Sequence, residues 1–396
     1  MKIIGIDDSE EKAKKLNMRK LRIAIIVATI ILIFIVLFCI YLGNKNFRDF
    51  MDKYVLMKNV TENNVVAISL DDTENNNIYT YDKYICVFKN NTLTGYNSSA
   101  NKEYELTVKL TNPIVDINNR FLLIAEENGQ KIYLISGNNI LWEKELEGNI
   151  SKISVNKNGY VSVILTGTTY KSIIQTFDNN GNELFKTFIS YTIAMDSDIS
   201  NDNKYLSFVE INTSGTVIQS TVKTISMQKA KDNPSEAIIY TSTPLNDSVA
   251  ISLKYQDSNK LVCMYDNSIH VINNGTDEEI LNLNESGKKI SFSDIRLNNF
   301  VFRVIEKNIL LSTQSTVEIV NSSSKKSNIY TVDSVIKEVY CYNNVIALNL
   351  GSEVHFIGTN GWLIKKYISN QEVRKIVMNT DFAAVVYRDK VEIINL

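Results

Sequence analysis

The chain has few cysteine, histidine, proline and glycine residues, and these shortages exclude several classes of protein. It has 4 Cys and 2 His in 396 residues. Cys86, Cys263 and Cys341 each lie in a strand-like apolar run, which is typical of buried small hydrophobic side chains. A disulfide framework is therefore not expected, and too few Cys and His ligands are suitably spaced for a zinc site.

The chain also lacks an excess of positive or negative charge. The formal net charge is −2, so the chain lacks the basic footprint of a nucleic-acid-binding protein. It contains no phosphate-binding glycine-rich loop, no G-x-S-x-G elbow and no H-E-x-x-H pair. The sequence thus predicts no cofactor, no metal, no catalytic residue and no nucleic-acid partner.

One long apolar run is present, from Ile23 to Leu42, without a charge, Pro, Asn or Gly. A helix of about 20 residues spans the hydrocarbon core of a bilayer and satisfies its own backbone there. We therefore predict a transmembrane signal anchor at residues 23–42, with the lipid bilayer as its partner. A cleaved signal peptide and a lipid-modified Cys39 are the alternatives, but no small-residue cleavage site follows the run, and Phe38 precedes the Cys.

The flanks of the run predict its orientation. Six Lys and Arg residues lie between Lys12 and Arg22, whereas Lys45 and Arg48 follow the run beside acidic residues. The positive-inside rule then makes residues 1–22 a cytoplasmic tail and places the rest outside the cell membrane. In residues 43–64, apolar side chains recur at helical spacing, which predicts an amphipathic stalk.

Beyond Val65 the chain repeats itself, as two interleaved series of turn residues show. In each series the turns are about 36 to 56 residues apart, a period expected of propellers or solenoids. The first series has turns at residues 82, 118–119, 158–159, 202–203, 258–259, 298–299, 343–344 and 380–381. The second has turns at residues 97–98, 138–139, 180–181, 232–233, 274–275, 322–323 and 360–361. Many of these turns use Asn in place of Gly, because Asn tolerates a positive φ.

One unit shows what lies between the turns. Residues 150–155, 160–165, 173–177 and 183–188 are short runs rich in Ile, Val, Phe and Thr. Four such antiparallel strands in about forty residues make one propeller blade. A helical repeat is excluded by the strand-like period, and a parallel solenoid is disfavoured by the hairpin turns.

The number of blades follows from the ends of the repeat. The last unit stops after three strands, and residues 65–70 supply a strand before the first unit. Pairing the two ends in one blade would close the ring and remove exposed sheet edges. We therefore predict an all-β, eight-bladed propeller over residues 65–396. Seven blades is the alternative if residues 226–246 are not a regular blade edge.

Three repeats resemble known propeller families. Residues 138–148 (NNILWEKELEG) resemble the turn and outer strand of quinoprotein-type repeats, as in outer-membrane assembly lipoproteins, and residues 180–186 and 360–366 are weaker copies. Residues 200–208 resemble the inner hairpin of TolB-like and WD40-like blades. The whole layout resembles an uncharacterised family of Gram-positive membrane-anchored propellers. That resemblance implies no activity, and the groups that would hold a quinone cofactor cannot be aligned here.

A few polar residues are candidates for chemistry. His270 and His355 occupy equivalent repeat positions, which favours a structural role over catalysis. Residues 178–183 resemble a calcium loop only faintly, and a turn is expected there. The acidic residues 71–75 are expected to form a solvated loop. Asp196 and Asp198 precede a hairpin, where they could bind a cation or cap the turn.

These observations predict a non-catalytic binding or scaffold module in the cell envelope, with a protein partner. A degenerate quinoprotein-like or hydrolytic enzyme is the first alternative, and clustered carboxylates in a polar central pocket would favour it. An extracellular sensor is the second alternative. The short inner tail would then need a partner to carry the signal.

Overall fold

The computed structural model describes residues 18–43, 51, 65–70, 77–309 and 312–396. The chain divides into two units, Met1–Asn59 and Val60–Leu396. The first contains helix α1 (Met18–Gly43), and its side chains at residues 22, 23 and 25–43 are almost all exposed. Its segment Ile25–Gly43 has a mean hydropathy of 3.3 and is long and apolar enough to cross a bilayer, a test that a signal sequence also passes. Apart from Met51, the predicted stalk beyond Gly43 lies outside the described residues.

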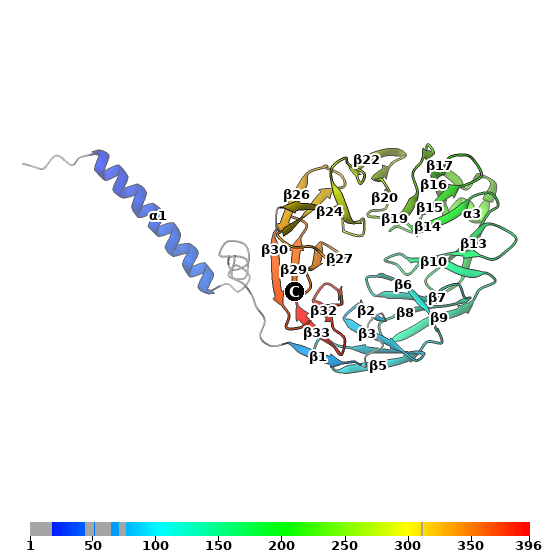
Figure 1. The fold of residues 1–396 in the computed structure, drawn as a ribbon, viewed down its shortest axis with the longest axis horizontal. Coiled ribbons are helices and arrows are strands. Elements are labelled where there is room, and N and C mark those ends of the chain that lie inside the picture. The colour runs from blue at the N-terminus through cyan, green and yellow to red at the C-terminus, as the bar shows by residue number, and fades with distance from the viewer. Residues whose placement is uncertain (1–17, 44–50, 52–64, 71–76, 310–311) are drawn as a thin grey trace, which may run out of the picture. The chain divides into compact units, whose positions relative to one another are not determined.

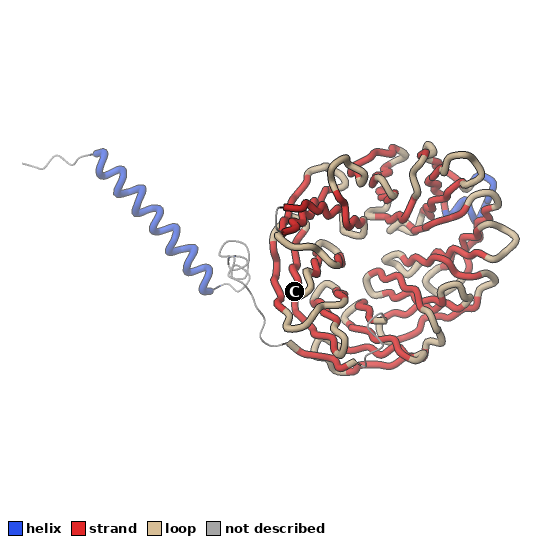
Figure 2. The backbone as a smooth tube through the Cα atoms, in the orientation of Figure 1, coloured by secondary structure: helices blue, strands red, loops and turns tan. Residues whose placement is uncertain are grey.

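The second unit is a ring of eight antiparallel sheets (Figures 1 and 2). The blades are numbered in chain order, and the strands of each are given from the innermost outward. The first blade is β2 (Ile78–Tyr81), β3 (Tyr84–Lys89), β4 (Thr92–Tyr96) and β5 (Lys102–Thr107), and the second is β6 (Pro113–Asn118), β7 (Phe121–Glu126), β8 (Lys131–Ser136) and β9 (Asn139–Glu145). The third blade is β10 (Asn149–Val155), β11 (Val161–Thr166), β12 (Ser172–Phe177) and β13 (Glu183–Ile189), and the fourth is β14 (Ile193–Ile199), β15 (Tyr205–Asn212), β16 (Gln219–Ser226) and β17 (Ile238–Thr241).

The other four blades complete the ring. The fifth blade is β19 (Ala250–Tyr255), β20 (Lys260–Tyr265), β21 (Ser268–Asn273) and β22 (Thr276–Asn282), and the sixth is β23 (Lys289–Asp294), β24 (Phe300–Ile309), β25 (Ser312–Asn321) and β26 (Ser327–Val332). The seventh blade is β27 (Glu338–Tyr342), β28 (Val345–Asn349), β29 (Glu353–Gly358) and β30 (Leu363–Ile368). The eighth is β31 (Lys375–Met378), β32 (Phe382–Val386), β33 (Lys390–Asn395) and β1 (Val66–Ser69).

The predicted closure is confirmed. Strand β1 pairs antiparallel with β33, so the two ends of the domain share the eighth blade. Ile68 lies opposite Val391 and is only 5% exposed. The ring therefore has eight blades, and the seven-bladed alternative is wrong.

The expected irregular stretch after β16 has a structure of its own. Ser226 caps a short helix, α3 (Met227–Asp232), by accepting a hydrogen bond from the Lys229 amide. A 3-10 turn, η1 (Pro234–Glu236), follows, and the short strand β18 (Leu245–Asn246) adds to β16. The turn predicted at residues 232–233 is thus a helix end, because six residues are too few to show a helical period in the sequence.

Neighbouring blades hold each other through apolar packing between their sheets. The Trp142 ring of β9 lies against Gly181 in the next blade, where an added Cβ would be 2.8 Å from the indole. Gly181 also needs a φ of +82°, so glycine satisfies both the turn and the close approach there. Trp142 also packs against Phe177, with ring centroids 5.7 Å apart and the rings tilted by 41°. As predicted, Cys86, Cys263 and Cys341 are free and buried.

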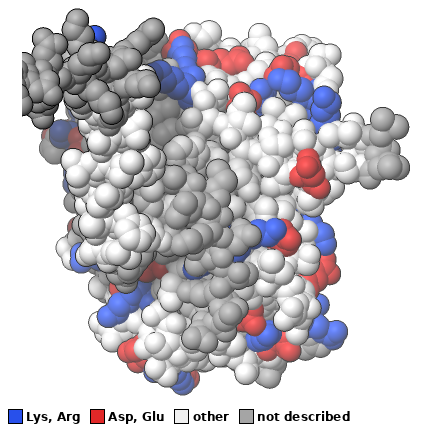
Figure 3. All heavy atoms as spheres, turned by 90° about the vertical axis from the view of Figure 1, so that its left-hand side faces the viewer, with Lys and Arg blue, Asp and Glu red and all other residues white. Residues whose placement is uncertain are grey.

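The predicted Asn turns also form as expected. At the inner turns, Asn119, Asn203, Asn299 and Asn343 all have positive φ between 51° and 60°. These turns join the first strand of a blade to the second, and we call the end of the ring where they lie the turn face. On the flank of the domain shown in Figure 3, positive and negative side chains are interspersed.

Candidate functional site

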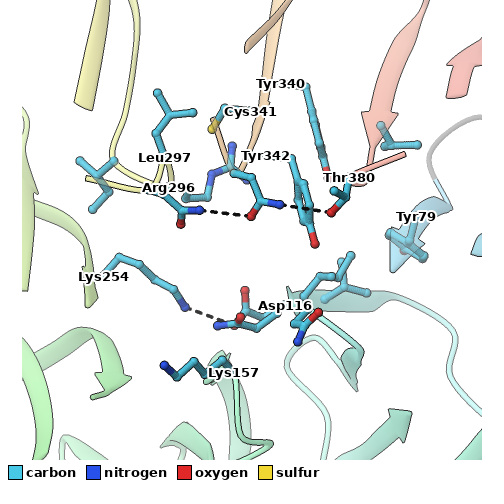
Figure 4. Close-up of a pocket in the computed structure, with 18 of the residues that line it drawn as sticks. Tyr79, Asp116, Lys157, Lys254, Arg296, Leu297, Tyr340, Cys341, Tyr342 and Thr380 are labelled. Carbon is cyan, nitrogen blue, oxygen red and sulfur yellow. Dashed lines mark hydrogen bonds and ion pairs between the residues drawn. The ribbon is translucent and has the colours of Figure 1, made fainter. Parts of the chain in front are cut away.

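A cavity of about 430 Å³ opens at the turn face, around the centre of the ring (Figure 4). We call this cavity the channel mouth. All eight blades contribute to it through their innermost strands and inner turns. The polar and aromatic residues that line it are Tyr79, Asp116, Asn118, Asn119, Lys157, Asn201, Lys254, Tyr255, Gln256, Arg296, Asn298, Tyr340, Tyr342, Asn343, Lys375 and Thr380.

An ion cluster forms one wall of the channel mouth. Lys254 of β19 lies 3.1 Å from the Asp198 carboxylate of β14 and 4.0 Å from that of Asp116 in β6. The Lys254 ammonium thus joins three blades (Figure 4 shows it beside Asp116). Burial acts to lower the pKa of Lys254, but the two carboxylates outweigh it and hold that pKa above its ordinary value. Burial raises the pKa of Asp198, whereas the positive charge of Lys254 acts to lower it.

The carboxylates of this wall tie β6 to β10 and β14 to β19. Asp116 accepts a hydrogen bond from the Val155 amide at 2.7 Å. Asp198 accepts one from the Tyr255 amide at 2.8 Å, and Asp196 accepts one from the Leu253 amide at 3.0 Å. Backbone donors of the next blade therefore occupy these carboxylates, which supports a structural role for them.

Asp196 makes stability depend on pH in an unusual direction. Burial raises its pKa from 3.8 to about 6, so the folded state binds its proton more tightly than the unfolded state. Its stabilising contribution is complete below pH 3.8 and is lost as the pH rises through about 6. The ionised Asp196 carboxylate then lowers the free energy of unfolding by on the order of 3 kcal/mol. Relative to the parent, Asp196→Asn should therefore be more stable at pH 8 than at pH 4.5, as urea unfolding would measure.

Asp202→Asn is the matched control for this prediction. Burial acts to raise the pKa of Asp202, but hydrogen bonds from Ser200 and Lys204 outweigh it and lower that pKa below 3.8. Its contribution is therefore constant from pH 4.5 to pH 8. Unfolding can be followed by the fluorescence of Trp142 and Trp362, both in the propeller. A pH-independent effect of Asp196→Asn would contradict the assignment.

The opposite wall is lined with amides and aromatic rings. Asn298, Asn343 and Thr380 form a string of hydrogen bonds of 3.4 and 3.2 Å across three consecutive inner turns (Figure 4). Arg296 binds Asp294 through Nε and Nη2, and its guanidinium lies 6.0 Å from the centre of the Tyr340 ring. This wall therefore presents amide donors and acceptors beside a cation.

Two further lysines face the channel mouth from other blades. Lys375 donates to the Ile78 carbonyl at 3.2 Å and lies over the Tyr79 ring, with its ammonium 5.5 Å from the centroid. Burial lowers the pKa of Lys375. Lys157 is exposed on the inner turn of the third blade, and no described residue forms a hydrogen bond or ion pair with it.

The two histidines do not line the channel mouth. They lie in equivalent third strands of their blades, as predicted. In β21, His270 contacts Asp277 at 2.9 Å and Ser268 at 3.1 Å. In β29, His355 contacts the Tyr330 hydroxyl at 2.9 Å and Glu353 at 3.2 Å. Burial lowers the pKa of His355. His270 is held by side chains of its own blade, and His355 is held by Glu353 of its own blade and by Tyr330 of the preceding blade, which are structural arrangements.

The other residues considered from the sequence have varied outcomes. Asp178 accepts hydrogen bonds from the Asn180 and Asn182 amides, so the expected turn is confirmed. Residues 71–75 lie outside the described residues. Turn capping by Asp196 and Asp198 is wrong, because these side chains reach the next blade, and the cation beside Asp198 is Lys254 of the chain itself. Within the described residues, no three His, Cys, Asp or Glu side chains converge as metal ligands.

Sequence reasoning missed Asp116, Lys157, Lys254 and Arg296 as members of a common site. One signal was present: an Asp-Ile pair precedes the inner turn at Asp116, Asp198 and Asp294. Each of those three aspartates holds a backbone amide or a cation at the channel mouth. The lysines have no such repeated signal.

Comparisons with known proteins agree with the fold. Residues 57–396 match the model of a family described as "Family of unknown function (DUF5711)". No curated protein matches the sequence significantly.

Among solved structures, Sqt1 from Chaetomium thermophilum is similar at 8% identity and a TM-score of 0.51, over 84% of this chain and 100% of that one. BamB from Moraxella catarrhalis is similar at 13% identity and a TM-score of 0.48, over 84% and 97% of the two chains. Hydrazine synthase from Kuenenia stuttgartiensis is similar at 10% identity and a TM-score of 0.45, over 83% and 97%. At such identities, similarity concerns the fold alone.

Proposed function

Because the chain belongs to the family of unknown function DUF5711, its family supplies no activity, and we propose a function from its architecture. The protein is a single-pass membrane protein whose propeller acts as a non-catalytic binding or scaffold module in the cell envelope. Its N-terminus is cytoplasmic, and its propeller lies outside the cell membrane and binds a protein partner.

Helix α1 supports the anchor. Its apolar segment Ile25–Gly43 has 19 residues, close to the length that spans the hydrocarbon core of a bilayer. The six Lys and Arg residues between Lys12 and Arg22, against Lys45 and Arg48 shortly after the run, support the orientation. Thr29 donates its hydroxyl hydrogen to the Ile25 carbonyl, so this polar side chain is satisfied within the helix.

The observation that carries the binding role is the channel mouth in a closed ring. The pairing of β1 with β33 completes the eighth blade and closes the ring, and each blade keeps only its short outermost strand at an edge. Inner strands and inner turns of all eight blades converge on one cavity, and the Asp116 and Asp198 carboxylates at its wall are held by neighbouring strands. A rigid ring with convergent turns is suited to recognition.

Photo-crosslinking in intact cells tests the proposal. The full chain carries benzoylphenylalanine at Asn343 on the turn face or at Tyr191, which is 90% exposed beyond the end of β13. A discrete adduct with the same partner protein in independent cultures is expected from at least one position. Uncrosslinked chain at both positions would overturn the binding role.

Protease added to whole cells tests the topology separately. Cells whose outer layers have been made permeable to protease, with the cell membrane intact, should lose the propeller and keep a fragment that contains α1. A propeller that is cleaved only after the cell membrane is lysed would place it in the cytoplasm and contradict the proposed orientation.

A further inference from the structure

Positive charge at the channel mouth is spread over separate walls. Of the described residues that line it, four are cationic and only Asp116 is acidic. The cations come from four different blades: the third, fifth, sixth and eighth blades supply Lys157, Lys254, Arg296 and Lys375. One small anion can contact only part of such a ring, whereas a ligand with several separated negative charges can contact more of it.

The cations differ in how far carboxylates of the chain already occupy their hydrogen-bond donors. Lys254 and Arg296 each hold a carboxylate of the chain, Asp198 and Asp294. Arg296 uses the fork of Nε and Nη2 for this, so that fork is not available for bidentate binding of a phosphate. Lys157 has no partner among the described residues and is exposed at the rim. The site therefore suits carboxylates that bind one donor at a time, with Lys157 as the first contact.

The rest of the lining is amphipathic. Asn118, Asn119, Asn298 and Asn343 bring amide groups that both donate and accept hydrogen bonds. The cavity is also lined by the half-buried aliphatic side chains of Val115 and Ile117 and by the half-buried rings of Tyr340 and Tyr342. Amides match the backbone of an extended peptide, and aliphatic groups match its apolar side chains. A uniformly polar acidic saccharide would leave this apolar surface without a partner.

We propose that the channel mouth binds an extended acidic peptide segment of a protein partner. This inference rests on the proposed binding function and assigns it a place and a chemistry. Carboxylates of the segment pair with Lys157 and the neighbouring cations, while its backbone bonds to the asparagine amides. Electrostatic complementarity of this kind also speeds association and selects against basic partners.

Fluorescence anisotropy with the full chain in detergent micelles tests the chemistry. The probe is a fluorescein-labelled octapeptide of alternating Glu and Ala, compared with octapeptides in which Gln or Lys replaces Glu. We expect the Glu peptide to bind at least about tenfold more tightly than the other two, and its affinity to fall as salt is added. Equal binding of the Glu and Gln peptides would overturn the proposal.

Two charge reversals in the third blade localise the site. Lys157 and Lys171 are both exposed, but Lys157 lies before β11 on the turn face and Lys171 lies after it, at the other end of the blade. We expect Lys157→Glu to weaken binding of the Glu peptide at least about tenfold and Lys171→Glu to leave it unchanged. Equal effects of the two variants would show that binding is not at the channel mouth.

The same experiments separate this inference from the proposed function. Stronger binding of oligogalacturonate than of the Glu peptide would replace the peptide with an acidic saccharide. Crosslinks in cells from Tyr191, without any from Asn343 and without Glu-peptide binding, would overturn the inference and leave the binding role intact.

Discussion

Aspartate in place of Ile68 is expected to open the propeller. Ile68 is the buried residue of β1, and it packs with Ile78, Phe382 and Ile393 across the eighth and first blades. The variant loses this apolar contact and places a charge in the core, which should cost more than about 4 kcal/mol. That is a large part of the stability of a typical domain. Urea unfolding followed by tryptophan fluorescence would measure the loss.

Val66→Asp is the control, because Val66 lies in the same strand, pairs with the same partner and is 42% exposed. This control substitution should lower the free energy of unfolding much less than Ile68→Asp does. Opening the ring would also expose the edge of β33, so Ile68→Asp should form larger species in size-exclusion chromatography. A variant as stable and monodisperse as the control would show that β1 is not needed for closure.

Methionine in place of Lys254 is expected to cost about 3 to 5 kcal/mol, because it leaves the Asp198 carboxylate buried without its cation. The Asp198 side chain is only 2% exposed, and it would keep only the hydrogen bonds from Tyr255 and Ser154. Without Lys254, the pKa of Asp198 should rise further. The folded state of the variant would then bind this proton more readily, so its deficit should shrink as the pH falls.

A second substitution tests the mechanism of this loss. In the Lys254→Met and Asp198→Asn double variant no buried charge remains at the pair, and most of the lost stability should return. Lys325→Met is the surface control, because Lys325 and its partner Glu278 are both about half exposed. It should cost less than about 1 kcal/mol. A double variant no more stable than Lys254→Met would show that the charge pair is not the cause.

Most of the fold could be predicted because its signals are local. The four strands predicted in residues 150–188 agree with β10 to β13 to within one residue at each end. Alternation of apolar residues and Asn or Gly turns mark each strand where it stands in the chain. In the third blade, the outermost strand Glu183–Ile189 has exposed residues, whereas the second strand, Val161–Thr166, is buried along almost its whole length.

Helix α3 was missed for the opposite reason. Its six residues, MQKAKD, are mostly polar, and only Met227 and Ala230 are buried. Its position is decided by the Ser226 cap and by packing against the third blade, where Ile174 and Ile189 lie in the same cluster. The cap is local, but the packing against the third blade cannot be seen in a window of sequence.

The amino-acid sequence by itself determined the apolar helix, the repeated four-stranded unit and the strand that closes the eighth blade, because each depends on the order of residues along a short segment. Only the tertiary structure decided the channel mouth. Asp116, Asp198 and Lys254 are separated by more than fifty residues in every pair, and closure of the ring brings their side chains together. Which aspartate meets which lysine depends on the angle between blades, and that angle is set by packing across the whole ring.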